Sequence, residues 1–573
     1  MALTKVTGGL LGNLPTGTGN VAVGDTALDS IESGAENNVA IGSGAGTAVT
    51  TAEFNTLIGS LSGDALTVGN KNTALGYNTL GSDTKGDRNV AVGTDALANQ
   101  NFTTSTDSYN TAVGMNAGFS VTTGTNNTFI GGLAGDATTT ADNNTAVGAS
   151  ALGANTTGAN NVALGYLALT ANTTAGSNVA LGDQSLKTNT TGASNTAVGQ
   201  GSLQANTTAA NNTAVGKDAL AANTTGTANS AMGGTTLTTN TTGSYNSGFG
   251  RDSLGLNTTG SNNTAVGESA LYANTTGNNN TAVGKSALVA NTTGSYNLAA
   301  GMVALDANTD GDFNTALGYA ALSDSTTADN NTAVGYYSLL RNTTGVQNTF
   351  LGSLSGTNAT TGDNNTGVGI YAMGNAVVTG SVNTAIGYAG LYELTSGSNN
   401  VAIGRDTGRA GSPGGLITTQ SGQLLLGDDN ITNAHIQVSL TVASDERDKT
   451  DFADLDLGLD FIKALEPVTY YWDKRSKYGD KTADDYDLDA QTPDGTHKED
   501  WMDIGFKAQA VRDLEEAAGY EIAEKKNLTV SLSGDGKQYG LKYEKFIPIL
   551  VKAIQELSAE NAALTARIEA LES

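Results

Sequence analysis

Residues 263–277 read NTAVGESALYANTTG, and close copies of this stretch fill most of the chain. The opening pentapeptide, Asn-(Thr/Val)-Ala-(Val/Ile/Leu)-Gly with small variations, occurs 23 times between Asn20 and Asn400. From Asn110 to Asn365 the copies are spaced 17 residues apart without exception. A fixed period of this kind indicates a solenoid, in which each repeat forms one coil of the stack.

The repeat unit itself predicts how one coil is built. Its Thr-Ala-Val segment suits a short strand whose side chains alternate between two faces, and the Gly that follows permits a turn at positive φ or a close backbone approach. An Ala-Leu pair adds an inward apolar group, and Asn-Thr-Thr-Gly supplies turn residues. One unit holds too few apolar side chains to form a core, so coils must stack to bury them. We predict a mostly β fold, a parallel β-solenoid over residues 20–404.

The repeat resembles the head of trimeric adhesins of the YadA type, where a comparable Asn-x-x-Ala-Ile-Gly motif forms a parallel β-roll in each of three chains. The resemblance covers roughly residues 20–404. The family's repeat is shorter than the one found here, so the loops must differ. The resemblance implies a homotrimer, with the recurring Ala positions at close contacts between chains.

The repeats contain no obvious catalytic or metal-binding cluster. Acidic residues are scattered singly, whereas a glycosidase needs two carboxylates that flank one bond. Asp306, Asn308, Asp310 and Gly311 resemble the start of a calcium loop, but the twelfth position is Leu317 instead of Glu. We therefore expect no cofactor and no metal ion, and we interpret the many Asn-Thr-Thr triplets as turns in preference to glycosylation sites.

One repeat is longer than the others, with 21 residues from Asn89 to Asn110. Its stretch 94–110, TDALANQNFTTSTDSYN, is a candidate for receptor contacts. A tolerated loop insertion is the simpler interpretation of the same stretch.

The charge distribution divides the chain near Ser444. Of the 28 Lys and Arg residues, 11 lie in residues 1–443 and 17 in the last 130 positions, together with both Trp residues. A net charge of −27 argues against a nucleic-acid partner, because phosphate contacts need clustered cations. The N-terminal stretch lacks the apolar core of a signal peptide, and no apolar run is long enough for a membrane span, so we expect no membrane insertion.

Residues 405–443 are expected to form a connecting β segment, and a dense charge cluster, ASDERDKTDF at 443–452, follows it. Its Ser-Asp-x-Arg-x-Lys pattern is similar to the start of the endosialidase-type intramolecular chaperone domain of phage tail spikes and fibres. Further matching segments follow in order: LGLDFIKALEPVTYYW at 457–472, IGFKAQAVRDLEEA at 504–517, with Lys507 where an apolar residue is usual, and YGLKYEKFIPILVKAIQEL at 539–557. The resemblance implies a small α+β chaperone and autoprocessing domain over residues 444–573.

The same resemblance implies self-cleavage. Ser444 matches the self-cleaving serine, Lys449 matches the lysine paired with it, and Asp445 and Arg447 are expected to orient the pair. A hydroxyl becomes a good nucleophile when a base takes its proton, and lysine can be that base when desolvation or nearby cations lower its pKa. Which bond beside Ser444 is cut, and whether the attack stays within one chain, are left open. Taken alone, the cluster also fits a solvated turn.

The end of the chain, residues 544–573, reads as a coiled-coil helix. Apolar residues recur at alternating steps of three and four, which defines a heptad seam. The seam consists of Ile547, Leu550, Ile554, Leu557, Asn561, Leu564, Ile568 and Leu571. Asn561 at an interior position could fix the register. Ile at a with Leu at d favours a two-helix coiled coil when the helix is isolated. This conflicts with three chains, and we expect the attached solenoid, not the seam, to set the number of chains at three.

These features predict a phage tail fibre that binds a host-cell surface receptor, either glycan or protein, and that sits in the virion tail after synthesis in the host cytoplasm. Residues 1–19 would attach it to the virion or to an adaptor protein. The chaperone would align three chains and then be released by cleavage at Ser444, which traps the solenoid kinetically. Single-turnover self-cleavage by a serine–lysine peptidase is the only enzymatic activity expected. The alternatives are a bacterial trimeric surface adhesin, for which we find no export signal, and a tail spike that degrades polysaccharide, for which we find no catalytic domain.

Overall fold

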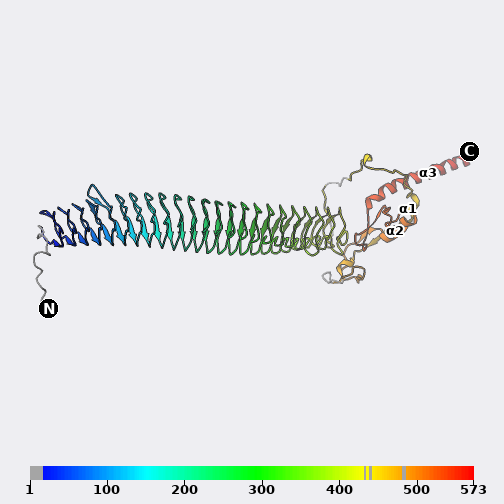
Figure 1. Ribbon diagram of the computed structural model, residues 1–573. Coiled ribbons are helices and arrows are strands. Elements are labelled where there is room, and N and C mark those ends of the chain that lie inside the picture. Colours follow the sequence, from blue (N-terminus) through cyan, green and yellow to red (C-terminus); the bar gives the residue numbers. More distant parts are fainter. Residues whose placement is uncertain (1–16, 432–433, 438–441, 480–485) are drawn as a thin grey trace. The chain divides into compact units, whose positions relative to one another are not determined.

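The computed structural model describes residues 17–431, 434–437, 442–479 and 486–573. The chain divides into two units, residues 1–329 and 330–573, and each is described by itself. Stacked coils make up the first unit and open the second, where a small domain follows them (Figure 1). The predicted mostly β fold, a parallel β-solenoid of about 17-residue coils followed by a small domain with a terminal helix, is confirmed. The attachment segment predicted for residues 1–19 lies almost entirely outside the described residues.

Each coil contributes one strand of three residues. The strands of the first unit are β1 Val21–Val23, β2 Val39–Ile41, β3 Thr56–Ile58, β4 Thr73–Leu75, β6 Val90–Val92, β8 Thr111–Val113, β9 Thr128–Ile130, β10 Thr145–Val147, β11 Val162–Leu164, β12 Val179–Leu181, β13 Thr196–Val198, β14 Thr213–Val215, β15 Ser230–Met232, β16 Ser247–Phe249, β17 Thr264–Val266, β18 Thr281–Val283, β19 Leu298–Ala300 and β20 Thr315–Leu317. Those of the second unit are β21 Thr332–Val334, β22 Thr349–Leu351, β23 Thr366–Val368, β24 Thr384–Ile386, β25 Val401–Ile403 and β26 Leu424–Leu426.

The register between coils follows the sequence period. Within each unit a strand pairs in parallel with the next, and equivalent repeat positions face each other, as in Ala146 opposite Ala163 and Val147 opposite Leu164. The stack therefore places identical side chains above one another in columns. Each column is either buried or exposed along the solenoid, because successive residues of a strand point to opposite faces.

The residue in the middle of each strand, an alanine in most coils, points into its own coil. Ala146, Ala163 and Ala180, for example, have no exposed surface, and a column of leucines from the second apolar segment lies in the same core. The expectation that these alanines lie at contacts between chains is therefore wrong, because the strand alternation puts them on the inner face. The fourth repeat position points outward instead, and it is apolar in every coil and never fully buried. We call this column the outer stripe; Leu164, Leu181 and Val215 belong to it.

Two ladders of buried asparagines satisfy the polar groups inside the coils. In the first ladder, the backbone N–H of Asn212 donates to Asn195 Oδ1 (3.0 Å), and its Nδ2 donates to the carbonyl of Gly226 (2.9 Å). In the second ladder, Asn223 Nδ2 donates to Asn206 Oδ1 (3.0 Å). These asparagines have no exposed surface. The Asn-Thr-Thr asparagines form the second ladder, which explains why turn segments repeat this residue so strictly: a buried polar atom without a partner is costly.

The stacking continues past the 23 repeats seen in the sequence. Strand β26 pairs in parallel with β25, with Val401 opposite Leu424. Gln423 takes the ladder position, and its backbone N–H donates to Asn400 Oδ1 (3.0 Å). Part of the segment 405–443, predicted as a connection, thus forms one further and longer coil.

The 21-residue coil carries an additional strand, which pairs with an additional strand of the preceding coil. These are β5 Gly86–Asp87 and β7 Thr106–Asp107, which pair in parallel. The additional residues therefore stack on the preceding coil and are held by backbone pairing.

The C-terminal domain combines helices with two antiparallel strand pairs. Its elements are the single-turn helix η1 Glu446–Asp448, α1 Leu459–Ala464, β27 Val468–Tyr470, η2 Arg475–Lys477, β28 Asp503–Gly505, α2 Ala508–Ala517, β29 Val530–Leu532, β30 Tyr539–Leu541, η3 Tyr543–Lys545 and α3 Phe546–Glu572. Strand β27 pairs with β28, and β29 pairs with β30. Among the described residues no helix has both the length and the apolar character needed to cross a membrane.

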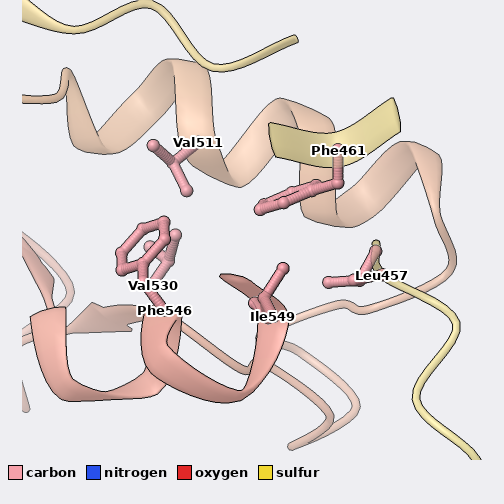
Figure 2. Packing of buried hydrophobic residues seen from close by; sticks show 6 residues of the cluster. All are labelled: Leu457, Phe461, Val511, Val530, Phe546 and Ile549. Carbon is pink, nitrogen blue, oxygen red and sulfur yellow. The ribbon is translucent and has the colours of Figure 1, made fainter. Parts of the chain in front are cut away.

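A small apolar core holds this domain together (Figure 2). Helices α1, α2 and the start of α3 each direct side chains into it, and the buried members are Leu457, Phe461, Val511, Val530, Phe546 and Ile549. The remainder of α3 has a different environment. The apolar residues of the heptad seam, from Ile547 to Leu571, are all exposed in a single chain. Helix α3 therefore turns one face into its own domain and leaves the seam uncovered.

A buried carboxylate fastens α2 to the segment before β29. Glu515 is 1% exposed; its Oε1 accepts hydrogen bonds from Thr529 N (2.6 Å) and Thr529 Oγ1 (2.5 Å), and its Oε2 accepts one from Leu528 N (3.3 Å). We expect Glu515→Ala to destabilise the domain by about 3 kcal/mol, because it leaves buried donors without an acceptor. Urea unfolding of the full-length protein followed by tryptophan fluorescence reports this domain, since both Trp residues lie in it. Exposed Glu516→Ala is the matched control, and equal midpoints for the two variants would contradict the prediction.

Candidate functional site

The four charged and polar residues predicted as a site meet in one tight turn. Helix η1, Glu446–Asp448, forms a single 3₁₀ turn directly after Ser444 and Asp445. Such a turn reverses the chain within a few residues. It brings the fifth residue after Ser444, which is Lys449, back to the start of the turn.

Ser444 and Lys449 are in direct contact. Lys449 Nζ lies 2.6 Å from Ser444 Oγ and 3.1 Å from the carbonyl oxygen of Ser444. A nucleophile within hydrogen-bond reach of a basic group is the geometry that nucleophilic catalysis requires. The same distance is that of an ammonium–hydroxyl hydrogen bond, in which Lys449 Nζ donates to Ser444 Oγ.

Asp445 and Arg447 stabilise the turn instead of touching the serine. Asp445 Oδ1 accepts from the backbone N–H of Arg447 (2.9 Å) and caps η1, while Arg447 Nη2 donates to Asp445 Oδ2 (2.6 Å). The side-chain and backbone hydrogen bonds from Arg447 hold the pKa of Asp445 below its usual value. Asp445 therefore stays ionised as a cap at neutral pH, which agrees with an orienting role.

The turn is open to solvent in a single chain. Ser444, Asp445, Arg447 and Lys449 are all exposed. A lysine becomes an effective base when burial disfavours its charged form, and nothing in the described part of this chain covers the pair. The contact between Ser444 and Lys449 is thus present, and the described part of the chain leaves both side chains in solvent.

The position of this turn is matched by a comparison with protein families. Residues 444–520 match the chaperone of endosialidase. This is a family of self-cleaving chaperone domains, which supports autoprocessing of the chain. No curated protein and no solved structure matches the chain.

The endosialidase-chaperone match begins at Ser444 itself and runs past α2. Strands β29 and β30 and helix α3 lie beyond it. The match at the C-terminus and the long solenoid before it are together consistent with a tail fibre or a tail spike.

The remaining sequence expectations have structural explanations. Asn308, part of the calcium-like stretch, is buried in the second asparagine ladder, where its Nδ2 donates to Asn291 Oδ1 (2.8 Å). No cluster of three or more potential metal ligands occurs among the described residues. Sequence reasoning missed Glu515, whose only signal is an acidic residue at an apolar helix position. It also missed the outer stripe, which the strict apolar character of the fourth repeat position could have revealed.

Proposed function

We propose that this protein is the precursor of a homotrimeric phage tail fibre whose C-terminal domain guides assembly and then cuts itself off at Ser444. The observation that carries the proposal is the contact between Ser444 Oγ and Lys449 Nζ at the first residues of the endosialidase-chaperone match. The long solenoid before this point supplies the part that remains after cleavage.

The dyad supports cleavage of the bond between Ala443 and Ser444. Lys449, as the neutral amine, takes the proton of Ser444 Oγ, and the oxygen attacks the carbonyl carbon of Ala443. The C–N bond breaks as the ester to Ser444 Oγ forms, and Ser444 N receives the proton from Lys449. Water then hydrolyses the ester, which leaves a carboxylate on Ala443 and a free amine and hydroxyl on Ser444. No cofactor takes part.

Assembly would supply the missing desolvation. Because the turn is exposed in one chain, neighbouring chains that cover it would favour the neutral amine of Lys449. Cleavage would then follow trimerisation, and an unassembled chain would keep its chaperone domain. In this order, the chaperone domain is not removed before the solenoid has formed.

Two apolar surfaces support a homotrimer. The outer stripe presents an aliphatic or other apolar side chain in every coil, and the seam of α3 presents seven exposed apolar residues. Contiguous exposed apolar surface on this scale marks an interaction site. The outer stripe recurs once per coil, and the seam follows the heptad period. Identical chains that run parallel and in register share both periods, so they can bury both surfaces at the same time.

The mature product would be a tail fibre, and its partner would be a receptor on the host-cell surface. The virion tail is its expected location, with attachment to the virion or to an adaptor through the N-terminal segment. The acidic solenoid, in a chain of net charge −27, favours solubility of a long particle over binding to nucleic acid.

The test is the intact mass and the native mass of the purified protein. We expect two polypeptides, residues 1–443 and 444–573, and a native mass of three copies of the larger one. Leu557→Lys, in the seam, should reduce both trimer and cleavage, while the neighbouring Ser558→Lys should leave both unchanged. A single uncut chain of 573 residues, or a cut product that is monomeric, would contradict the proposal.

A further inference from the structure

Positive φ recurs at residues other than glycine in three columns of the solenoid, and one of these columns is exposed in most coils. The residue immediately before the first-ladder asparagine has a positive φ in nearly every coil, as in Asn160 (φ 60°), Asn262 (φ 60°) and Asn279 (φ 58°). Asparagine is the commonest residue in this column, and tyrosine comes next with Tyr109, Tyr245 and Tyr296. Asparagine tolerates the left-handed region better than other residues with a side chain, so its frequency here has a direct physical cause.

Several coils depart from this preference, for example those of Tyr245 and Phe313, but only near the start of the solenoid do four consecutive coils do so. Their residues in the column are Phe54 (φ 60°), Lys71 (φ 59°), Arg88 (φ 64°) and Tyr109 (φ 49°). Bulky residues are strained in this region. All four are exposed, so none of them gains burial in the coil core that would compensate for the strain. Arg88 and Tyr109 contact each other, whereas Phe54 and Lys71 make no ring contact or ion pair among the described residues, so strain retained there points to a function for these two side chains.

Two of these residues, Phe54 and Lys71, border a surface groove. A cavity of about 440 Å³ lies along the same coils, and Glu53, Phe54, Asn70, Lys71 and Ser105 contribute to its walls. Ser105 comes from the 21-residue coil, so the insertion builds one side of the groove. A groove of this size with one aromatic ring and a few convergent polar groups is typical of a small-molecule or oligosaccharide site.

The walls of the groove are held in place by Asp87 beneath them. Asp87 is 8% exposed; its Oδ1 accepts from Asn70 N (2.5 Å) and its Oδ2 accepts from Ser105 Oγ (2.8 Å). The same carboxylate therefore joins the repeat wall to the inserted wall. Asn70 Oδ1 in turn accepts from Glu53 N (2.7 Å). Such anchoring fixes a binding surface before the ligand arrives, which lowers the entropic cost of binding.

The charged groups along the groove differ in whether they already have partners within the chain. Arg88 is engaged, since its Nε donates to Asp107 Oδ1 (2.7 Å) and its guanidinium lies 5.6 Å from the centre of the Tyr109 ring. Lys71 makes no side-chain hydrogen bond or ion pair within the described part of the chain. The groove thus offers an ammonium donor from Lys71, a carboxylate acceptor from Glu53 and the exposed ring of Phe54.

We infer that this groove binds an oligosaccharide, and that it is the receptor-binding site of the proposed fibre; this inference rests on the proposed function. A sugar ring has an apolar face that stacks on an aromatic ring and a rim of hydroxyls that both donate and accept hydrogen bonds. Phe54 supplies the ring, Lys71 donates, and Glu53 accepts. From Phe54 to Tyr109 the column spans three coil steps, about 14 Å, so a chain of several sugars can follow it.

The charge balance favours an uncharged oligosaccharide over a polyanion. Residues 53–109, which include the residues of the groove from Glu53 onward, hold three cations (Lys71, Lys85 and Arg88) and six carboxylates. With a chain of net charge −27 around it, the site has no excess positive charge to attract a polyanion. Binding should therefore change little between low and moderate salt, unlike binding through phosphate contacts.

The test uses full-length protein on an array of neutral bacterial and eukaryotic oligosaccharides, with the affinity for bound probes then measured at two salt concentrations. We expect Phe54→Asn and Lys71→Asn each to weaken binding, the former by at least about tenfold, as for loss of an aromatic anchor. Asparagine is the usual residue of this column, so both variants should fold. Tyr296→Asn is the matched control, because Tyr296 occupies the same column (φ 60°) but stacks on Phe313 at 5.0 Å, far along the sequence from the groove.

The outcomes test the proposed oligosaccharide site independently of the proposed fibre function. Binding to a neutral oligosaccharide that is lost in Phe54→Asn and kept in Tyr296→Asn supports the inference. Wild-type protein that binds none of the array, or that binds equally well in all variants, overturns it. Intact and native masses measured on the same samples report cleavage and trimer formation. A cleaved trimer without groove-dependent binding therefore leaves the proposed function standing and removes only this site.

Discussion

Ser444→Ala protein should remain a single chain of 573 residues under conditions in which the wild type is cut into 1–443 and 444–573. The variant removes the nucleophile and keeps the turn, because η1 is capped by Asp445 and not by Ser444. Loss of the nucleophile should slow cleavage by at least about a thousandfold. Intact mass spectrometry after timed incubation measures the uncut fraction directly.

Variants of Lys449 distinguish its role as a base from a role as a positive charge. Lys449 Nζ touches Ser444 Oγ at 2.6 Å, and Lys449→Arg preserves a positive charge and hydrogen-bond donors at this place. Arginine is not deprotonated in proteins and cannot take the serine proton. We therefore expect Lys449→Arg to be as inactive as Lys449→Ala. Glu446→Ala, in the same turn but outside the dyad, should still be cut, and an active Lys449→Arg variant would show that the lysine is no base.

Gly233→Ala should break the stacking of the solenoid locally, whereas Gly234→Ala should be almost silent. Gly233 has φ +140°, and a Cβ at this position would lie 2.7 Å from both the carbonyl carbon and the oxygen of Gly250 in the next coil. Neither backbone atom can move without disturbing the coil that it belongs to. A Cβ on Gly234 would have no atom within 4 Å, so this adjacent residue is a matched control.

The expected cost of Gly233→Ala is about 3 kcal/mol or more, from the strained φ and the backbone clash together. Gly234→Ala should change stability by no more than about 0.5 kcal/mol. Coils contact mainly their neighbours, so the damage should stay local. Hydrogen exchange should therefore rise around β15 and β16 and remain unchanged in distant coils. Equal hydrogen-exchange rates in Gly233→Ala and Gly234→Ala would contradict the interpretation of Gly233 as a stacking contact.

The solenoid could be predicted from the sequence because its period is also its hydrogen-bond register. A repeat of 17 residues places Ala146 opposite Ala163, so residues that are 17 apart in the sequence are also partners in neighbouring strands. The period does not reveal which face of the strand is inside. Alternation fixes only that Ala163 and Leu164 point opposite ways; the structure shows that the alanine side faces inward, and Phe129 is buried at the same position. The further coil at β26 was missed because Gln423 and Leu425 replace the Asn and Ala that define the motif.

The candidate site was predictable for a different reason. The contact between Ser444 and Lys449 is local, since five residues and one 3₁₀ turn suffice to make it. The groove at Phe54 depends on distant residues, because Ser105 reaches Asp87 across the inserted strands. Its signal in the sequence was a departure from Asn in four consecutive copies of one repeat position, and that departure has meaning only once the left-handed backbone of the column is known.

The columns have a consequence for how the length of such a protein can change. Every buried asparagine, stacked glycine and core alanine takes its partners from coils that are 17 residues away along most of the chain. Removal or duplication of one whole repeat, a unit of 51 nucleotides in the gene, therefore recreates the same contacts at the new junction. Each such event shortens or lengthens the stack by about 4.8 Å. Solenoid length is thus open to recombination in whole steps, while insertions of other sizes survive only as bulges such as the 21-residue coil, where new chemistry can arise without interrupting the stack.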